Sequence, residues 1–320
     1  MRRHEPGEEG ARIRVSIPCP AKVNLFLRVL AREDTGYHQI ETLFQAVGLY
    51  DRIEVRAGDP GIALDIVPGE TAPGLGDLVS ELRGRDDNTV MRAARAFFGA
   101  TRIAPAVTLV LTKSIPAGTG LGGASTDAAG TLVALNALYG QPLQSDRLLE
   151  IGGAIGADVP FFCAGSPAAI AWGRGDRLLT CPPPPPATLA VIIPEDRIAT
   201  AAAYRDVARN LTLPAPPRRL QGLAEGTWEA IAALQANDFE AGAFARFPVF
   251  AEVRALLEGE GALIARMTGS GSAIFGVFTS PGRARNAARQ AEMTPGVVAS
   301  FTAPTLMAMP RADRETPRGM

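Results

Sequence analysis

The stretch "SIPAGTGLGGASTDAAGTLVALNALYG" spans residues 114–140 and decides how the rest of the chain is interpreted. Four glycines fall within residues 118–123, and a nearly continuous apolar segment follows them. Glycine allows a backbone to adopt positive φ and to approach another group closely. The apolar side chains of Leu132, Val133, Leu135 and Leu138 leave the following helix almost no polar face. The sequence therefore predicts a tight loop and then a buried helix that opens near Ser125 and ends near Tyr139.

Three phosphate-binding motifs compete for the glycine loop. A P-loop requires a lysine directly after its last glycine, and none is present here. The dinucleotide pattern G-x-G-x-x-G is formally met by Gly118, Gly120 and Gly123. However, "GQPLQSDRLLE" after the helix is a loop into another helix, and the second strand of a βαβ unit is missing.

The third motif is a loop that wraps the phosphates of a nucleotide at the N-terminus of a helix. The first-turn amides of a helix lack intrahelical acceptors, and the helix dipole favours an anion there. Ser125, Thr126 and Asp127 would add hydroxyl donors and an N-cap. The alternative is an ordinary glycine-rich turn that caps a core helix.

Composition narrows the class of protein. The 320 residues are 47% hydrophobic and 20% charged, with a net charge of −1, so a nucleic-acid partner is not expected. No apolar run is long enough to span a bilayer, and residues 1–14 have no apolar core of a signal peptide. Three cysteines and two histidines argue against a disulfide framework and a histidine-rich metal centre. We expect a cytoplasmic protein without membrane contact.

The order of elements predicts an α+β fold in two domains. Strands are expected at residues 12–17, 23–30, 52–56, 62–67 and 106–115, with helices at 87–99 and 145–155 and a hairpin around residues 173–175. Five prolines at 182–186 form a stiff break, and a strand "TLAVIIP" follows. Helices near 200–209, 227–236, 239–245, 248–258 and 282–293 and strands around 261–278 and 297–302 complete the second half. We expect domains at 11–181 and 187–308, and a disordered tail at 309–320.

Several stretches resemble the GHMP kinases, the superfamily of galactokinase, homoserine kinase and mevalonate kinase. "IPAGTGLGGASTDAA" is similar to their ATP loop, and "MTGSGSAIFGVF" (267–278) to their third motif. "PAKVNLFLRVLAREDTGYHQIETLFQAV" (20–47) and "GADVPFFCAGSPAAIAWGRGDRL" (156–178) resemble the 4-diphosphocytidyl-2-C-methyl-D-erythritol kinases within that superfamily. Ala124, Ser125 and Thr126 stand where the family commonly has Gly-Ser-Ser.

The resemblance implies a two-domain kinase with its ATP and substrate sites in the cleft between the domains. ATP would bind the loop, which comprises Pro116, Ala117, Gly118, Thr119, Gly120, Leu121, Gly122, Gly123, Ala124, Ser125 and Thr126. The partner would be a small molecule, a cytidine-diphospho sugar alcohol, phosphorylated on its 2-hydroxyl group in isoprenoid precursor synthesis. Two alternatives stay open: a GHMP kinase for another small alcohol, and a non-catalytic nucleotide-dependent sensor.

The resemblance assigns Asp158 as the base and Lys22 as its cationic partner. Alone, Asp158 could equally cap the turn before Pro160, and Lys22 could be a solvated strand lysine. Asn24 lies on the same strand face as Lys22 and either orients the substrate or bonds to a turn. Magnesium is implied by ATP, and Ser125 or Thr126 is a candidate ligand.

The substrate's cytosine would be recognised by the "GYH" turn. The resemblance assigns base stacking to Tyr37 and base-edge hydrogen bonds to His38. It assigns the opposite face of the base to Tyr204, in "TAAAYRD". The alternative for all three side chains is surface packing and a hydrogen bond to a loop carbonyl.

Overall fold

The computed structural model describes residues 13–34, 36, 38–69, 88–210, 226–234 and 236–315. The first of its two sheets has seven strands in the order β11-β1-β2-β4-β3, with β5 pairing to β2 and β6 to β5. Neighbours are antiparallel except β3 and β4. The strands are β1 (Arg14–Arg32), β2 (His38–Ala57), β3 (Gly61–Pro68), β4 (Ala106–Lys113), β5 (Ala168–Gly173), β6 (Arg177–Thr180) and β11 (Asp313–Glu315).

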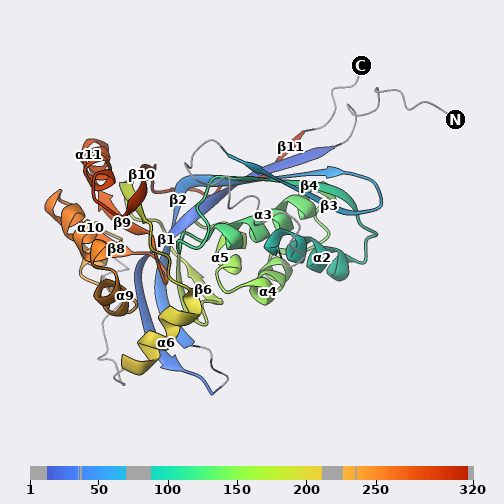
Figure 1. Ribbon diagram of the computed structural model, residues 1–320. Coiled ribbons are helices and arrows are strands. Elements are labelled where there is room, and N and C mark those ends of the chain that lie inside the picture. The colour runs from blue at the N-terminus through green and yellow to red at the C-terminus, as the bar shows by residue number, and fades with distance from the viewer. Residues whose placement is uncertain are drawn as a thin grey trace.

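The hairpin of β1 and β2 runs along the length of the molecule (Figure 1). Two separate strands were expected at 12–17 and 23–30, but β1 continues through Pro18 and Pro20. Proline is tolerated in strands at bulges and at edges. A register shift lies between Pro20 and Ala21, and β11 pairs with β1 only as far as Ser16. Both conditions let the prolines stay in the strand.

Helices α2 to α5 lie together against one face of this sheet (Figure 1). The helix α3 is central, since it contacts β1, β2 and the other three helices. It begins at Gly123, with Gly122 as a left-handed N-cap and no side-chain cap, so the expected start near Ser125 was two residues late. The four helices are α2 (Thr89–Thr101), α3 (Gly123–Leu138), α4 (Ser145–Ile155) and α5 (Val159–Cys163).

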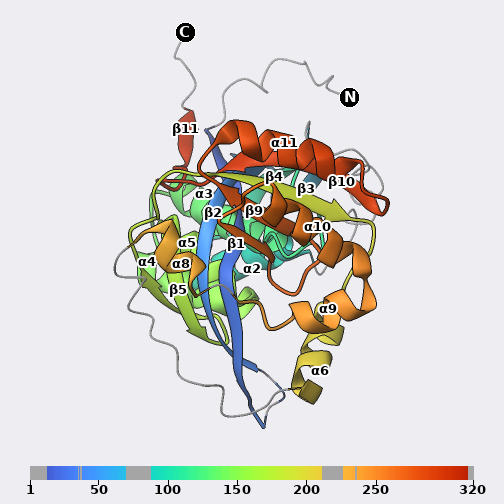
Figure 2. The ribbon, with the colours of Figure 1, turned by 90° about the vertical axis from the view of Figure 1, so that its left-hand side faces the viewer.

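The second sheet has the order β10-β7-β9-β8, and α10 and α11 lie in front of it in Figure 2. Its strands are β7 (Thr188–Pro194), β8 (Ile264–Met267), β9 (Ile274–Phe278) and β10 (Val297–Pro304). The helices of this half are α6 (Thr200–Asn210), α8 (Trp228–Ala232), α9 (Glu240–Arg246), α10 (Pro248–Gly259) and α11 (Pro281–Glu292). The α+β class is confirmed.

The two halves share a hydrophobic core. One cluster joins Val23 and Phe26 of β1 to Val191 of β7 and Phe275 of β9. The chain passes between the halves across the proline run, from the end of β6 to the start of β7. Because of the shared cluster, the domain bounds 11–181 and 187–308 remain a proposal.

The expected disordered tail at 309–320 is corrected in part. Residues 313–315 form β11, an edge strand beside the start of β1. Met309 and Ala312 also pack against the core of the first half. The chain therefore returns to its first sheet at its end. Within the described residues, no helix has the length and apolar character to cross a membrane.

Candidate active site

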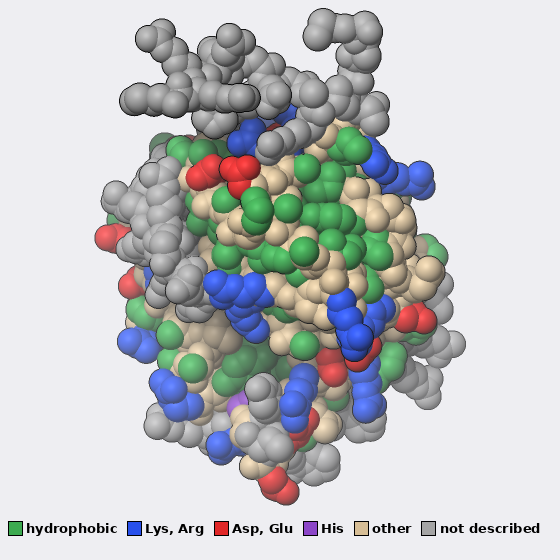
Figure 3. Space-filling view, turned by 90° about the vertical axis from the view of Figure 1, so that its right-hand side faces the viewer, with side chains coloured by type: hydrophobic (Ala, Val, Ile, Leu, Met, Phe, Trp, Pro, Cys, Tyr) green, Lys and Arg blue, Asp and Glu red, His purple; other side chains and the backbone are tan. Residues whose placement is uncertain are grey.

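A cleft of about 1560 Å³ lies where β1, the glycine loop, α5 and α6 meet. Pockets for one small ligand usually measure about 300–1,000 Å³, so this cleft has room for two. Figure 3 shows basic side chains, with acidic ones among them, on the lower half of one face of the molecule. The charged residues that line the cleft are Lys22, Arg32, Arg92, Lys113, Arg174 and Arg205, against Asp127, Asp158 and Asp176. Its electrostatic character favours anionic ligands.

The glycine loop and the start of α3 form one wall of this cleft. Gly118, Gly120 and Gly122 have φ of 68°, 79° and 79°, in the left-handed region. The backbone N–H groups of Gly123 and Ala124 donate to no described residue, whereas those of Ser125 and Thr126 donate to the Gly122 carbonyl. Two free amides and the positive end of a buried helix dipole suit a phosphate.

Two of the loop glycines have neighbours within the protein. A Cβ on Gly120 would lie 2.1 Å from the Thr268 carbonyl oxygen, and one on Gly122 would lie 2.9 Å from Lys22 Cγ. Backbone hydrogen bonds fix the loop on the same side: the Leu121 carbonyl accepts from Lys22 N at 2.9 Å. Part of the glycine requirement therefore comes from packing of the loop against β1 and residue 268.

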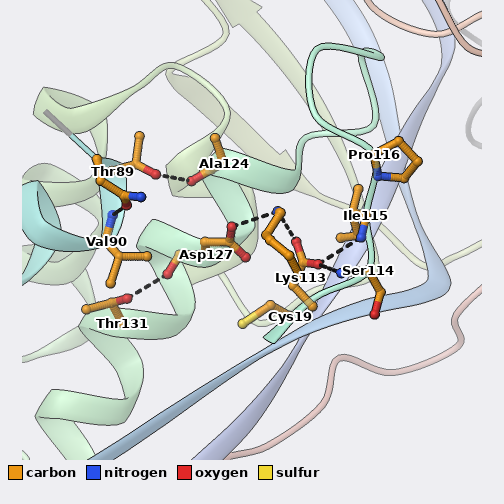
Figure 4. Close-up of polar contacts among 12 residues, drawn as sticks. Cys19, Thr89, Val90, Lys113, Ser114, Ile115, Pro116, Ala124, Asp127 and Thr131 are labelled. Atoms are coloured by element: carbon orange, nitrogen blue, oxygen red, sulfur yellow. Dashed lines mark hydrogen bonds and ion pairs between the residues drawn. The ribbon is translucent and has the colours of Figure 1, made fainter. Parts of the chain in front are cut away.

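Beneath the loop lies an ion cluster that sequence reasoning missed. Lys113 Nζ contacts Asp51 Oδ2 and donates to Asp127 Oδ2 at 2.9 Å. Asp51 Oδ1 accepts from the backbone N–H of Ser114 at 2.6 Å and of Ile115 at 2.8 Å. In Figure 4, Lys113 lies between Asp127 and the segment that enters the loop.

The cluster is charged and buried. Asp51 has no exposed surface and Lys113 has only 3%. Burial lowers the pKa of Lys113, but the charges of Asp127 and Asp51 outweigh burial and raise the pKa above its ordinary value. Burial raises the pKa of the Asp127 carboxyl, which Lys113 partly opposes. No sequence pattern predicted a role for Asp51, because a single aspartate on a strand is expected to face the solvent.

The structure brings Lys22 and Asp158 together. Lys22 Nζ lies 3.4 Å from Asp158 Oδ2 and donates to Asn24 Oδ1 at 2.7 Å. The lysine side chain is only 3% exposed, so Lys22 is not a solvated strand residue. Asp158 precedes α5 but makes no capping hydrogen bond with its side chain. It is 30% exposed and lines the cleft.

Two expected base-binding residues lie against each other. The rings of His38 and Tyr204 stack with centroids 4.7 Å apart and an interplanar angle of 30°. A base on this face of Tyr204 would require the His38 ring to move. His38 Nε2 is buried without a partner among the described residues. Tyr37 lies outside the described residues.

Burial and nearby charges shift the pKa of both His38 and Tyr204. Burial, and then the charge of Arg32, lowers the pKa of His38, which favours a neutral imidazole near pH 7. Burial, and then the negative charge of Asp158, raises the pKa of Tyr204 to about 12. Tyr204 therefore keeps its phenolic proton in this cleft.

The candidate magnesium ligands differ in position. Ser125 lines the cleft, whereas Thr126 is buried and does not line it. The described residues contain no group of three or more His, Cys, Asp or Glu side chains that could hold a metal ion. An ion that arrives with nucleotide phosphates, and needs few protein ligands, fits such a site.

Comparisons with known proteins agree with this geometry. Residues 88–166 match the model for the GHMP kinases N terminal domain, and residues 220–293 that for the GHMP kinases C terminal domain. A 4-diphosphocytidyl-2-C-methyl-D-erythritol kinase of Solibacter usitatus is 38% identical, with 83% of this chain and 81% of the relative covered. The enzyme of that name from Geobacter sp. (strain M21) is 36% identical, with 88% and 96% covered.

A solved structure gives the same result. The crystal structure of a 4-(cytidine 5'-diphospho)-2C-methyl-D-erythritol kinase superposes with a TM-score of 0.72 at 33% identity. The match covers 91% of this chain and 98% of that one. The chain therefore belongs to the 4-diphosphocytidyl-2-C-methyl-D-erythritol kinase family of the GHMP kinases.

Proposed function

We propose that this chain transfers the γ-phosphoryl group of ATP to the 2-hydroxyl group of 4-diphosphocytidyl-2-C-methyl-D-erythritol, in the methylerythritol phosphate route to isoprenoid precursors. The observation that carries the proposal is the Lys22–Asp158 pair, 3.4 Å apart in the cleft beside the glycine loop. A small-molecule kinase needs this combination: a phosphate-binding loop, a carboxylate and a cation within reach of one another.

ATP is bound by the loop from Pro116 to Ser125. The free N–H groups of Gly123 and Ala124 face the phosphates, and the dipole of α3 adds attraction. The ammonium of Lys22, next to the loop, stabilises the negative charge that gathers on the transferred group. Its side chain passes directly beside Gly122, which places the ammonium close to the phosphate site.

Asp158 acts as the general base. Its carboxylate takes the proton of the 2-hydroxyl group while that oxygen bonds to the γ-phosphorus, and the bond from the γ-phosphorus to the bridging oxygen of ADP breaks. Partial exposure keeps the carboxylate in reach of the substrate. A helix-capping role would instead occupy its oxygens, and no such bond is present.

Magnesium, when bound with ATP, neutralises charge on the β- and γ-phosphates. We assign the hydroxyl of Ser125 as its protein contact, because Ser125 lines the cleft at the start of α3. Phosphate oxygens and water supply the other ligands, as Mg²⁺ prefers.

Cytosine is bound beside His38, whose neutral ring has a buried Nε2 with no hydrogen-bond partner among the described residues. That nitrogen supplies one hydrogen bond to the base edge. Selection of cytosine over uracil follows, because the wrong edge would leave a buried polar group unpaired. Tyr204 contacts the base from α6 once the His38 ring turns away from it.

The test is a phosphoryl-transfer assay over a panel of alcohols: the cytidylated methylerythritol, its uridine analogue, homoserine, mevalonate and galactose. We expect turnover with the cytidylated compound and at least about a tenfold preference over the uridine analogue, about 1.4 kcal/mol. His38→Ala should erode that preference without changing the KM for ATP. Turnover of another alcohol alone would favour a different GHMP kinase, and ATP binding without any transfer would favour a sensor.

A further inference from the structure

The amide of Asn24 is held by its neighbours in one orientation. Asn24 Nδ2 donates to Thr42 Oγ1 at 2.8 Å, and Asn24 Oδ1 accepts from Lys22 Nζ at 2.7 Å. Asn24 is almost completely buried. Both ends of its amide are thus engaged within the protein, and Asn24 contacts Lys22 directly.

The direction of the Thr42 hydroxyl fixes this amide. Thr42 Oγ1 donates to the Phe26 carbonyl at 2.6 Å, and a carbonyl can only accept. A hydroxyl has one hydrogen, so toward Asn24 it presents only lone pairs. The amide must therefore turn its NH₂ group to Thr42 and its oxygen to the ammonium of Lys22. The flipped amide would point N–H groups at a cation.

The backbone supports the same arrangement. The register of β1 and β2 shifts between Asn24 and Phe26, and bulges of this kind re-aim side chains near active sites. Thr42 itself lies in the middle of the sheet, opposite Leu27 on β1 and Ala171 on β5, and is fully buried. Its χ1 angle is restricted by branching at Cβ. The hydroxyl has little freedom to turn elsewhere.

We propose that Thr42 is a positioning residue for phosphoryl transfer, which acts through Asn24 to hold the Lys22 ammonium toward Asp158 and the γ-phosphate. The inference rests on the proposed role of Lys22. On this proposal, Asn24 orients the side chain of Lys22 and not the substrate. Thr42 touches neither ligand, since it does not line the cleft.

One residue of the second half of the chain, Thr268, contacts Asn24 and the glycine loop. Thr268 Oγ1 accepts from Asn24 N at 3.2 Å and lies 3.2 Å from both Asn24 Oδ1 and the Gly120 carbonyl. Its single proton can serve only one of these two oxygens at a time. Thr268 thus secures the backbone of Asn24 to the loop, and when its proton serves Asn24 Oδ1 it favours the same amide orientation that Thr42 sets.

The variant Thr42→Val removes the hydroxyl and keeps the shape of the side chain. We expect kcat to fall about 10- to 100-fold, because displacement of a reacting group by about 1 Å costs up to 10²-fold in rate. The KM for ATP and for the cytidylated substrate should stay within about threefold. Thr42→Ser restores the hydroxyl and should restore kcat to within about threefold.

Thr305→Val is the matched control. Thr305 is buried and does not line the cleft, and within the described part of the chain its hydroxyl bonds only to the backbone of Ala187. It loses a buried hydroxyl like Thr42→Val, so it reports the effect of a structural defect alone. We expect its kcat to equal that of the parent. A fall in kcat equal to that of Thr42→Val would overturn the proposal.

Two further measurements keep the result decisive. If Thr42→Val does not fold, Thr42→Ala removes the hydroxyl together with the Cγ2 methyl group of threonine and adds no bulk, and the same loss of kcat is expected. Crystal structures of the valine and serine variants show the position of Lys22 whether or not the parent phosphorylates the proposed substrate. Retention of the Lys22–Asn24 contact and of parental kcat in Thr42→Val would refute the positioning role.

Discussion

At the scale of single residues, Asp158 and its neighbour Lys22 differ sharply in exposure, at 30% and 3%. We expect Asp158→Asn to lower kcat by about 10²–10⁴-fold, because the amide cannot take the proton of the hydroxyl. Folding and ATP affinity should be nearly unchanged, since the side chain is partly solvated. Steady-state kinetics with a calorimetric titration of ATP tests both statements.

The control for this variant is Asp176→Asn. Asp176 also lines the cleft, but its Oδ1 accepts from the backbone N–H of Arg174 in a turn. Its loss should leave kcat within about threefold. A turnover of Asp158→Asn within the same range would show that Asp158 is not the base.

The two buried lysines of the site should respond differently to replacement by methionine. Lys22→Met removes the ammonium, which lies 5.2 Å from the centroid of the Phe44 ring. It should reduce kcat more than it raises the Kd for ATP, since the charge of Lys22 counts most as negative charge develops. Lys113→Met leaves Asp51 and Asp127 buried without their cation. Breaking such a buried pair costs about 3–5 kcal/mol of unfolding free energy.

Urea denaturation and single-turnover kinetics on both variants separate these effects. Lys113→Met should have a lower urea midpoint and Lys22→Met a lower chemical rate. If Lys22→Met changed only the affinity for ATP, the lysine would be a ground-state phosphate clamp.

Lys22 and Asp158 could be named from the sequence because each lies in a family motif. Asp51, Lys113 and Thr42 could not. Their importance depends on which residues the sheet places beside them, and Asp51 meets Lys113 from a strand 62 positions away. Hydrogen-bond direction at Thr42 likewise follows from the register of β1 and β2, which no periodicity reveals.

At the scale of elements, the glycine loop offers a matched pair of substitutions. Gly122 and Gly140 flank α3 and both have φ of 79°. A Cβ on Gly122 would lie 2.9 Å from Lys22 Cγ and 3.1 Å from Phe162 Cζ, whereas one on Gly140 has nothing within 4 Å. Both alanine variants pay the cost of a left-handed backbone, about 1–2 kcal/mol.

Only Gly122→Ala should also displace the Lys22 side chain and weaken the binding of ATP. We expect a loss of at least tenfold in ATP affinity for Gly122→Ala and none for Gly140→Ala, by isothermal titration. Equal affinities in the two variants would mean that the loop does not contact the nucleotide as proposed.

Most elements could be predicted from the sequence, because their apolar periodicity and their capping or turn residues agree. The start of α3 was misplaced, since Ser125 and Asp127 suggested an N-cap and the helix instead begins after a left-handed glycine. The continuity of β1 through Pro18 was also missed. A bulge and a mostly unpaired edge, which made proline acceptable, are properties of the sheet.

At the scale of the whole molecule, the shared core predicts how the protein unfolds. Val23 and Phe26 of the first half pack with Val191 and Phe275 of the second, so separating the halves would expose apolar side chains of both. We expect one calorimetric transition, with the calorimetric enthalpy equal to the van't Hoff enthalpy. Saturating ATP should raise the midpoint of that single transition. Two resolved transitions would show that the halves fold independently.

The end of the chain was the poorest prediction at this scale. Residues 313–315 are fully polar, and composition alone suggested a disordered tail. They pair with β1 through backbone hydrogen bonds and an ion pair between Arg14 and Glu315. Such pairing depends on an open strand edge and not on apolar side chains, so hydrophobic patterns do not reveal it.

The basic side chains along the cleft affect the rate at which the substrates associate with the protein. Both proposed substrates are polyanions. Lys113 and Arg174 are paired with Asp51 and Glu33, so the field that attracts the substrates before contact comes from the other basic side chains that line the cleft. Attraction of this kind is screened beyond about 8 Å at physiological salt. Added salt should therefore slow the association of ATP and of the sugar alcohol. The chemical step, which takes place in direct contact with Lys22 and Asp158, should be almost unchanged.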